Sequence, residues 1–365
     1  MNREKEKMVY VLNVDWNWIK QRPQFIAEYL ASYFDIQAIY QYRYKRNGLQ
    51  KRNSGDINLK AIYVIPGGDR CQCLSMINKK IKHAVVSNEI IHTRPSILYL
   101  TLPKQIDLIP NSFKGIIIYD CMDNHPAFIS DELERNRLIT QEKRLINKSN
   151  IVLVSSKKLM SVLVERYGKC IEDKLFLIRN GYNGPIIDMD ETKGDSVNEL
   201  YTFSYFGTIG KWFNFDYLIN ILNEFSDIKF ELYGPVDGIE IPQHDRLHYN
   251  GTVEHSDLLR TVKNSDCFIM PFVVNDIIKS VDPVKLYEYI NFNKNILTCY
   301  YNEIDRFEPF VYFYSSYEDF KNQIRLLKTD KKIKYSAKLR EDFLKSNSWE
   351  YRVCQIVDII KKYNA

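Results

Sequence analysis

The sequence predicts an α/β protein of two Rossmann-like domains, each with helices on both faces of a parallel sheet. Apolar runs typical of buried strands alternate with segments of helical periodicity along most of the chain. The polar, acidic stretch 186–199 interrupts this alternation once, and the alternation restarts at Tyr201. The 365 residues are enough for two domains of ordinary size, so we interpret 186–199 as the linker between them.

In the first half, the apolar run 8–14 predicts the first strand. The helix expected at 21–34 has apolar side chains spaced to line one side. The helix expected at 130–149 has a cap signal, an acidic first turn and a basic end. Further strands are expected at 36–42, 97–103, 115–123, 150–156 and 175–183, and a helix is expected at 157–168.

The second half repeats the pattern. Strands are expected at 201–207, 228–234, 247–253, 266–272 and 295–301, and helices at 215–225, 255–265, 316–328 and after Asp282. A last helix is expected at 346–365, where Trp349 and Val353 are suited to burial. Two such domains that face each other place ligands at the carboxyl ends of their strands, so we expect the site in a cleft between them.

Charge and cysteine content narrow the function classes. Residues 1–185 carry 29 Lys and Arg against 18 Asp and Glu, a net charge of +11, and the remainder carries −6. The basic residues gather at 42–52 and 78–83, and either cluster alone is typical of a solvated face. The asymmetry between the halves favours a partner, which can be nucleic acid, an anionic membrane surface or a phosphorylated substrate. Seven scattered cysteines argue against a disulfide framework, and the Cys71–Cys73 pair lacks the second pair that zinc would need. A charged start and the absence of long apolar runs predict a cytoplasmic protein without a signal peptide or membrane span.

The segment 280–298 is the most informative. Asp282 is a suitable N-cap, and Pro283 suits the first helical position. Lys285 and Glu288 lie three residues apart and therefore share a helix face. A helix N-terminus with a lysine in its first turn can hold a diphosphate, and a carboxylate one turn further can accept hydrogen bonds from ribose hydroxyls. The alternative is an ordinary capped helix with a surface Lys–Glu pair.

Other strand ends of this half carry glycine or polar residues. Gly207 and Gly210 let the backbone approach a ligand, and Lys211 can neutralise a phosphate. The turns at 233–235 and 251–253 can bring backbone groups against a nucleobase edge. Each of these turns is also common without a ligand.

The first half offers acid, base and aromatic residues after its strands. Trp16 and Trp18 are expected in an exposed loop, where they would stack on sugar rings or pack on the neighbouring domain. Gln21 and Arg22 begin the next helix and can meet an acceptor or a phosphate.

A concentrated acid/base group follows another strand of the first half. It comprises Asp120, Asp123 and His125, one of which can remove a proton from an acceptor hydroxyl. The alternative is a helix cap with a backbone hydrogen bond.

Together these pieces resemble the GT-B fold glycosyltransferases, particularly the bacterial enzymes of capsule and teichuronic-type surface polysaccharides. The matching segments are DWNWIKQRPQFIA, YDCMDN, FSYFGTIGKWFNFDYL, ELYGP, NGTVEHSDLLRTVKNSDCFIMPF and DPVKLYEYINFNKNILT. The resemblance implies an acceptor-binding domain at 1–185, a sugar-nucleotide domain at 200–345, and a C-terminal helix at 346–365 that crosses back to the first domain.

The resemblance also implies roles for residues. The expected donor-binding residues are Gly207, Lys211, Tyr233, Gly234, Thr252, Val253, Ser280, Val281, Asp282, Pro283, Lys285, Leu286 and Glu288. The expected acceptor-binding residues are Trp16, Gln21, Arg22 and His125, and the expected catalytic residues are Asp123, Asp120 and Lys285.

One position departs from the family pattern. Many retaining members carry two glutamates separated by seven residues; here Glu288 matches the second, and Val281 stands at the first. An inverting mechanism with Asp123 or Asp120 as base therefore stands beside the retaining one. No D-x-D motif lies between the domains, so no metal is expected to be required.

The resulting hypothesis is transfer of a sugar from a nucleoside-diphosphate sugar, foremost a UDP-sugar, to a lipid-linked or glycan acceptor. The basic first half would face an anionic membrane surface, as a peripheral protein on the inner face of the plasma membrane. The alternatives are a sugar-nucleotide epimerase of the same fold, a non-catalytic nucleotide-sugar sensor, and a nucleic-acid-binding protein. No nucleic-acid module supports the last, and the sequence leaves the oligomeric state open.

Overall fold

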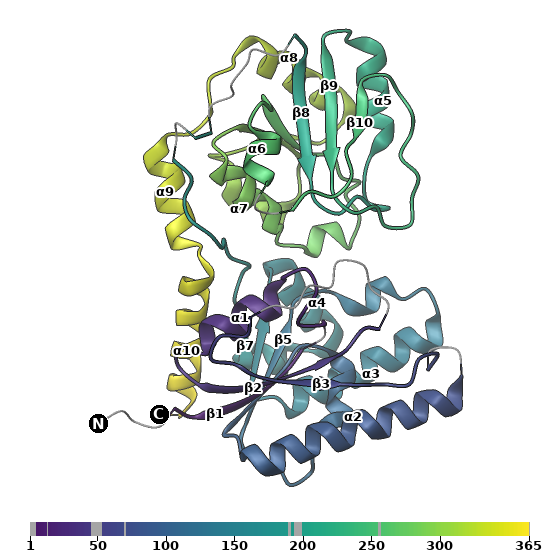
Figure 1. Cartoon of the computed structure of the whole chain (residues 1–365), viewed down its shortest axis with the longest axis vertical. Helices are drawn as coiled ribbons and strands as arrows, with labels where there is room; N and C mark the ends of the chain where they lie inside the picture. Colours follow the sequence, from purple (N-terminus) through teal and green to yellow (C-terminus); the bar gives the residue numbers. More distant parts are fainter. Residues whose placement is uncertain are drawn as a thin grey trace. The chain divides into compact units, whose positions relative to one another are not determined.

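The computed structural model describes residues 5–12, 14–44, 53–68, 71–188, 191–192, 199–254 and 257–364. The chain forms two compact units, Met1–Asn180 with Trp349–Ala365, and Gly181–Ser348. Each unit contains one parallel sheet with helices packed against it, so the predicted α/β class with two Rossmann-like units is confirmed (Figure 1). The basic segment predicted at 42–52 lies outside the described residues from 45 onward, as do residues 189, 190 and 193–198 of the predicted linker.

The sheet of the first unit has the strand order β3-β2-β1-β4-β5-β6-β7. Its strands are β1 (Lys7–Val11), β2 (Asp35–Gln41), β3 (Asn58–Ile62), β4 (Ile97–Leu100), β5 (Ile116–Cys121), β6 (Ile151–Val154) and β7 (Leu175–Leu177). Its helices are α1 (Arg22–Leu30), α2 (Gln72–Thr93), α3 (Glu132–Lys148), α4 (Lys157–Tyr167) and the C-terminal α10 (Trp349–Asn364).

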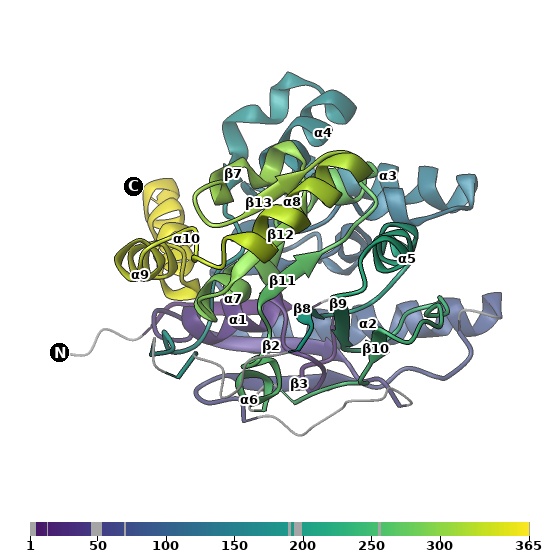
Figure 2. The same ribbon diagram turned by 90° about the horizontal axis from the view of Figure 1, so that it is seen from above.

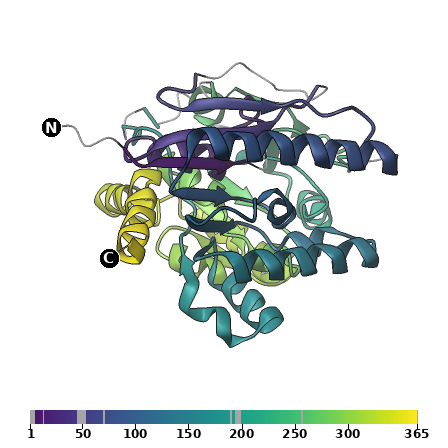
Figure 3. The same cartoon turned by 90° about the horizontal axis from the view of Figure 1, so that it is seen from below.

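Two apolar layers cover the faces of this sheet. Helices α1 and α10 bury side chains such as Ile26 and Val353 against alternate residues of the central strands, including Tyr10 and Tyr99. Helices α2, α3 and α4 cover the opposite face. Figure 3 shows α2, drawn in dark blue, running along the sheet. The packing of α10 beside α1 confirms that the C-terminal helix belongs to the first unit.

The sheet of the second unit has the order β10-β9-β8-β11-β12-β13. Its strands are β8 (Tyr201–Phe206), β9 (Ile228–Tyr233), β10 (Leu247–Tyr249), β11 (Cys267–Met270), β12 (Asn295–Cys299) and β13 (Tyr312–Tyr314). Its helices are α5 (Phe215–Glu224), α6 (Leu258–Val262), α7 (Val284–Asn291), α8 (Tyr317–Thr329) and α9 (Ala337–Ser346). Figure 2 shows α8 crossing over β12 and β13.

The sequence patterns did not predict four elements: β3, α2, β13 and α9. In β3 only one residue is fully buried, as befits an edge strand, so its sequence lacks an apolar run. The 22-residue α2 buries only Asn78, Val86 and Ile90, which is too sparse a set to form a clear apolar stripe. β13 spans three residues, and α9 buries only two. Weak burial therefore explains why these elements leave little periodic signal.

In both units the predicted site residues lie at the ends of strands, in the loops that follow them, or in the first turns of the next helices. Because all paired strands in each sheet are parallel, their carboxyl ends gather at one edge. No helix in the described part of the chain combines the length and apolar character needed to cross a bilayer.

Candidate active site

The second unit brings three turns together at the carboxyl ends of its strands. The Gly207 N–H donates to the Tyr233 carbonyl at 2.9 Å, and the Gly234 N–H donates to the Gly251 carbonyl at 2.8 Å. Gly234 has φ +130°, and a Cβ there would lie 2.1 Å from the Gly207 carbonyl oxygen. Only glycine fits this close backbone approach, so the turns after β8, β9 and β10 form one packed surface.

Helix α7 places a charged pair beside this surface. Lys285 Nζ lies 2.8 Å from Glu288 Oε2, and both side chains are partly exposed. Lys285 Nζ also lies 5.3 Å from the centroid of the Phe206 ring. A Cβ at Gly207 would be 3.1 Å from Lys285 Cε, so the lysine stem lies against the turn after β8. The structure thus joins Gly207, Lys285 and Glu288 as the sequence predicts.

The N-cap prediction for Asp282 is wrong. Helix α7 begins at Val284, and Pro283 occupies the N-cap position. The Asp282 carboxylate is fully buried, forms an ion pair with Arg306 and accepts a hydrogen bond from the Tyr287 hydroxyl at 3.2 Å. The Asp282 side chain therefore anchors the loop before α7 to the interior of the unit, and it is not available to a phosphate.

The neighbouring positions of this loop are also largely internal. Ser280 ends a short 3-10 helix, is buried, and donates a hydrogen bond from Oγ to the Asp276 carbonyl at 3.0 Å. Leu286 belongs to the apolar core and Pro283 is buried, whereas Val281 is half-buried.

The remaining predicted donor residues lie around the turns. Lys211 is exposed, and its Cε lies 4.0 Å from where a Cβ of Gly238 would be. Tyr233 is half-buried, and burial raises the pKa of its hydroxyl to about 12. Thr252 is exposed and Val253 is half-buried.

Two tyrosines near Glu288 were not predicted. The Tyr205 hydroxyl donates to the Thr208 carbonyl at 2.8 Å. The Asn291 amide donates to the Tyr182 hydroxyl at 2.6 Å, which in turn donates to the Pro185 carbonyl at 2.7 Å. Burial, and then the Glu288 charge, raise the pKa of both phenols. Nothing in the sequence separates these tyrosines from the many others in strands.

In the first unit, Arg22 and Asp120 form a buried ion pair. The Arg22 Nη2–Asp120 Oδ1 distance is 2.8 Å, and the side chains are 4% and 0% exposed. The Tyr99 hydroxyl donates to Asp120 Oδ2 at 3.1 Å, and Arg22 Nη1 donates to Asn180 at 3.3 Å. This arrangement engages both Asp120 oxygens in hydrogen bonds within the unit.

Asp123 has a different environment. It is half-buried, and burial raises the pKa of its carboxyl, although the charges of His125 and Arg22 oppose the rise. A raised pKa is what a general base needs to operate near neutral pH. The His125 N–H donates to the Asp123 carbonyl at 2.9 Å, and His125 Nε2 is a buried atom without a hydrogen-bond partner in the described chain. The structure therefore keeps Asp123 and His125 together in one short loop.

Arg166 holds this loop in place, a role that sequence reasoning missed. Arg166 Nη2 donates to Asn124 at 2.9 Å, and Nη1 donates to the buried Glu142 carboxylate at 3.0 Å. Glu142 also accepts hydrogen bonds from the Tyr119 and Tyr167 hydroxyls at 2.9 and 2.6 Å.

The prediction that Trp16 lies exposed is wrong. Trp16 is 1% exposed and packs in the layer that contains α1 and α10, whereas Trp18 is partly buried. Gln21 occupies the N-cap position of α1, and its backbone N–H donates to the Gln24 side chain at 2.9 Å. Of the predicted acceptor residues, Arg22 and Trp16 are thus internal, and Gln21 and His125 are the more accessible ones. Among the described residues, no group of three His, Cys, Asp or Glu side chains is arranged to hold a metal ion.

No protein-family model matches this sequence, and no curated protein sequence matches it. Solved structures do resemble it. Sucrose-phosphate synthase from Thermosynechococcus elongatus is 10% identical with a TM-score of 0.75, covering 98% of this chain and 99% of its own. HepE of Anabaena in complex with UDP is 12% identical with a TM-score of 0.71, covering 98% and 100%. A trehalose-6-phosphate structure from E. coli bound with UDP-2-fluoro glucose is 10% identical with a TM-score of 0.68, covering 96% and 98%. The chain therefore has the GT-B fold over nearly its whole length.

Proposed function

We propose that this protein is a glycosyltransferase that uses a nucleoside-diphosphate sugar, foremost a UDP-sugar, as donor. The observation that carries the proposal is the Lys285–Glu288 pair beside the glycine turns of β8 and β9. The lysine supplies charge to a diphosphate, and the carboxylate accepts from ribose hydroxyls. The UDP and UDP-2-fluoro glucose named for similar structures support the choice of nucleotide.

The proposed reaction divides its tasks between the two units. Asp123 takes the proton of the acceptor hydroxyl, and the oxygen attacks the anomeric carbon of the donor sugar. The bond between that carbon and the diphosphate oxygen breaks, and the nucleoside diphosphate leaves with the electron pair. The ammonium groups of Lys285 and Lys211 stabilise the negative charge of the departing nucleoside diphosphate. This route inverts the anomeric configuration. It is favoured because position 281 holds valine in place of the first glutamate of many retaining enzymes.

The acceptor class follows from charge. We propose a lipid-linked or glycan acceptor of surface polysaccharide synthesis, reached from the cytoplasm at an anionic membrane surface. The excess of basic residues in 1–185 supports this part of the proposal. Proton NMR of the product anomer distinguishes inversion from retention, because the two outcomes have different anomeric couplings.

Calorimetric titration with UDP, GDP, CDP and ADP tests the donor site. We expect one nucleotide to bind selectively and Glu288→Ala to weaken its binding about 10- to 100-fold, since one hydrogen bond to a charged group contributes about 1.5–3 kcal/mol. Glu341→Ala is a matched control, because Glu341 pairs with Lys345 on the surface of α9. Equal effects of the two substitutions, or binding of no nucleotide, would reject the donor site.

The competing epimerase differs in its product. An epimerase converts the nucleotide sugar without an acceptor, whereas a transferase leaves the donor unchanged until an acceptor is present. Incubation of the protein with the selected UDP-sugar alone, followed by NMR of the sugar ring, separates these activities. Accumulation of a second nucleotide sugar would replace the transferase assignment.

A further inference from the structure

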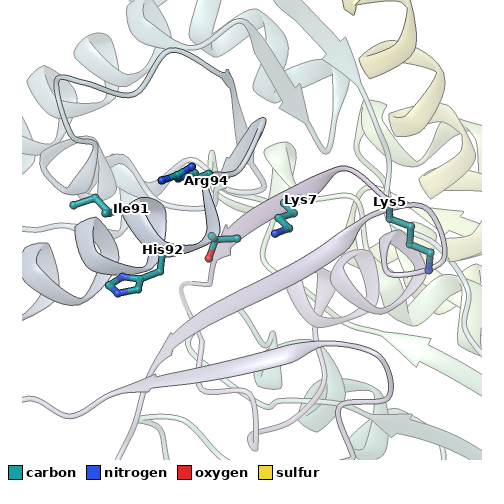
Figure 4. A pocket seen from close by; sticks show the side chains of 6 residues that line it. Lys5, Lys7, Ile91, His92 and Arg94 are labelled. Carbon is teal, nitrogen blue, oxygen red and sulfur yellow. The ribbon is translucent and has the colours of Figure 1, made fainter. Parts of the chain in front are cut away.

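A pocket of the first unit lies at the other edge of its sheet from Asp120 and Asp123. It has a volume of about 770 Å³ and is lined by Lys5, Lys7, Ile91, His92, Thr93 and Arg94. Lys7 begins β1, and His92 to Arg94 lie at the end of α2, just before β4 begins. Figure 4 shows Lys7 between the His92–Arg94 stretch and Lys5, with Lys5 lying apart from the other side chains.

Two cations of the pocket have no partner among the described residues. Within the described residues, neither Lys7 Nζ nor the Arg94 guanidinium has a hydrogen-bond acceptor or an ion-pair partner. Lys5 Nζ donates to the Ala31 carbonyl at 2.7 Å, and His92 Nδ1 contacts the Asn88 carbonyl at 2.8 Å, which leaves Nε2 open. Lys7 and Arg94 are therefore the two cations of the pocket whose N–H groups have no partner among the described residues.

Two acids near this pocket are hydrogen-bonded to neutral groups and form no ion pair with its cations among the described residues. The Glu6 carboxylate accepts from the Ser96 hydroxyl at 3.2 Å, and the Asp35 carboxylate accepts from the Asn58 amide at 3.4 Å. The carboxyl end of α2 attracts nearby cations, which can explain His92 and Arg94. It does not explain why Lys5 and Lys7, which come from β1 and the residues before it, lie on the same pocket.

We propose that the pocket of Lys5, Lys7, His92 and Arg94 binds a phosphate group. A phosphate offers several strong acceptor oxygens to cationic donors, here Lys7 of β1 and Arg94 at the end of α2. The phosphate can belong to a lipid headgroup or to a free phosphate compound, and the exposed Ile91 at the rim suits the former. The site is separate from the donor site and does not depend on the proposed transferase activity.

Two measurements on the full chain test the pocket and its source of phosphate. The first is the shift of the thermal unfolding midpoint when sodium phosphate replaces sodium chloride at equal ionic strength. The second is co-sedimentation with phosphatidylglycerol vesicles, compared with phosphatidylcholine vesicles. The variant is Lys7→Gln with Arg94→Asn, because asparagine tolerates the left-handed backbone of Arg94, at φ 49°.

The control is Lys331→Gln with Lys332→Gln, which removes the same charge from exposed positions of the second unit. We expect the pocket variant to bind phosphatidylglycerol vesicles about thirtyfold more weakly than the control, and to lose any phosphate-induced shift. Vesicle binding that depends on the pocket identifies a lipid headgroup; a pocket-dependent phosphate shift alone identifies a free phosphate compound.

Equal losses in the two double variants would show that net charge alone acts, and this would overturn the proposal. An absence of both phosphate and vesicle effects in the natural chain would also overturn it. Nucleotide titration of each variant confirms that the fold survives. It also separates failure of this pocket from failure of the donor site, because neither variant alters a donor residue.

Discussion

The Arg22 guanidinium donates three hydrogen bonds to the Asp120 carboxylate, at distances of 2.8 to 3.1 Å. The two residues lie 98 positions apart, and both are buried. Burial alone would lower the pKa of Arg22, but Asp120 outweighs it and raises that pKa. The pair links the start of α1 to the end of β5.

We predict that Asp120→Asn destabilises the protein by about 3–5 kcal/mol, because it leaves the Arg22 charge buried without its partner. Arg22→Met with Asp120→Leu should cost less than either single substitution, since no buried charge remains. Urea denaturation of the three variants measures the difference. A double variant as unstable as the sum of the singles would show that the ion pair is not coupled.

Asp123→Asn should abolish turnover while nucleotide binding is retained. Because burial raises the Asp123 pKa, the group is protonated at a higher pH than an ordinary carboxyl. A base must be unprotonated, so kcat/KM should rise with pH through this raised pKa and level off above it. Measurement of kcat/KM from pH 4 to pH 8 checks this. An inflection at or below the usual carboxyl pKa would point to another base.

Gly234→Ala should destabilise the second unit more than Gly251→Ala does. Both glycines have positive φ, but only at Gly234 does a Cβ meet the backbone, 2.1 Å from the Gly207 oxygen. The collision should add about 1–3 kcal/mol to the backbone strain that both substitutions share. The denaturation midpoints of the two variants are compared. Equal midpoints would mean that the turns after β8 and β9 can move apart to accept the Cβ.

His248 should make a pH-dependent contribution to stability. A hydrogen bond to Glu231, followed by one to the Asp245 carbonyl, raises the pKa of His248. A raised pKa means that the stabilisation is fully present below the unfolded-state pKa and is lost as pH rises through the folded-state pKa. His248→Gln should therefore destabilise the protein more at pH 5 than at pH 9. Thermal unfolding of the natural protein and the variant at both pH values tests this. The same difference in unfolding midpoint at pH 5 and pH 9 would contradict the prediction.

Several elements were predictable because their signals are local. The strands β1, β4, β5, β8 and β12 are apolar runs, and all of their residues except Lys7 are buried. The helix α3 carries an Asp131 cap that accepts from the Glu134 N–H, as its acidic start predicts. The helices α2 and α9 bury few side chains and were missed, although α9 has a Ser336 cap that accepts from the Leu339 N–H.

In the candidate site, local sequence spacing predicted the Lys285–Glu288 contact but not the partner of Asp282. Lys285 and Glu288 share one helical turn, so their contact follows from three-residue spacing. Asp282 also looked like part of that helix, yet it pairs with Arg306, 24 positions away. No local rule indicates which distant cation a carboxylate will meet.

The sequence by itself determined the alternation of strands and helices, and with it the glycine turns and charged residues at strand ends. Tertiary structure decided which of these side chains face inward. Trp16 entered the core, and Arg22 turned to Asp120 instead of toward solvent. The periodicity of a segment indicates which of its side chains face the core. The partner of a buried charge depends instead on the strand order, because the strand order brings residues together that are distant in the sequence.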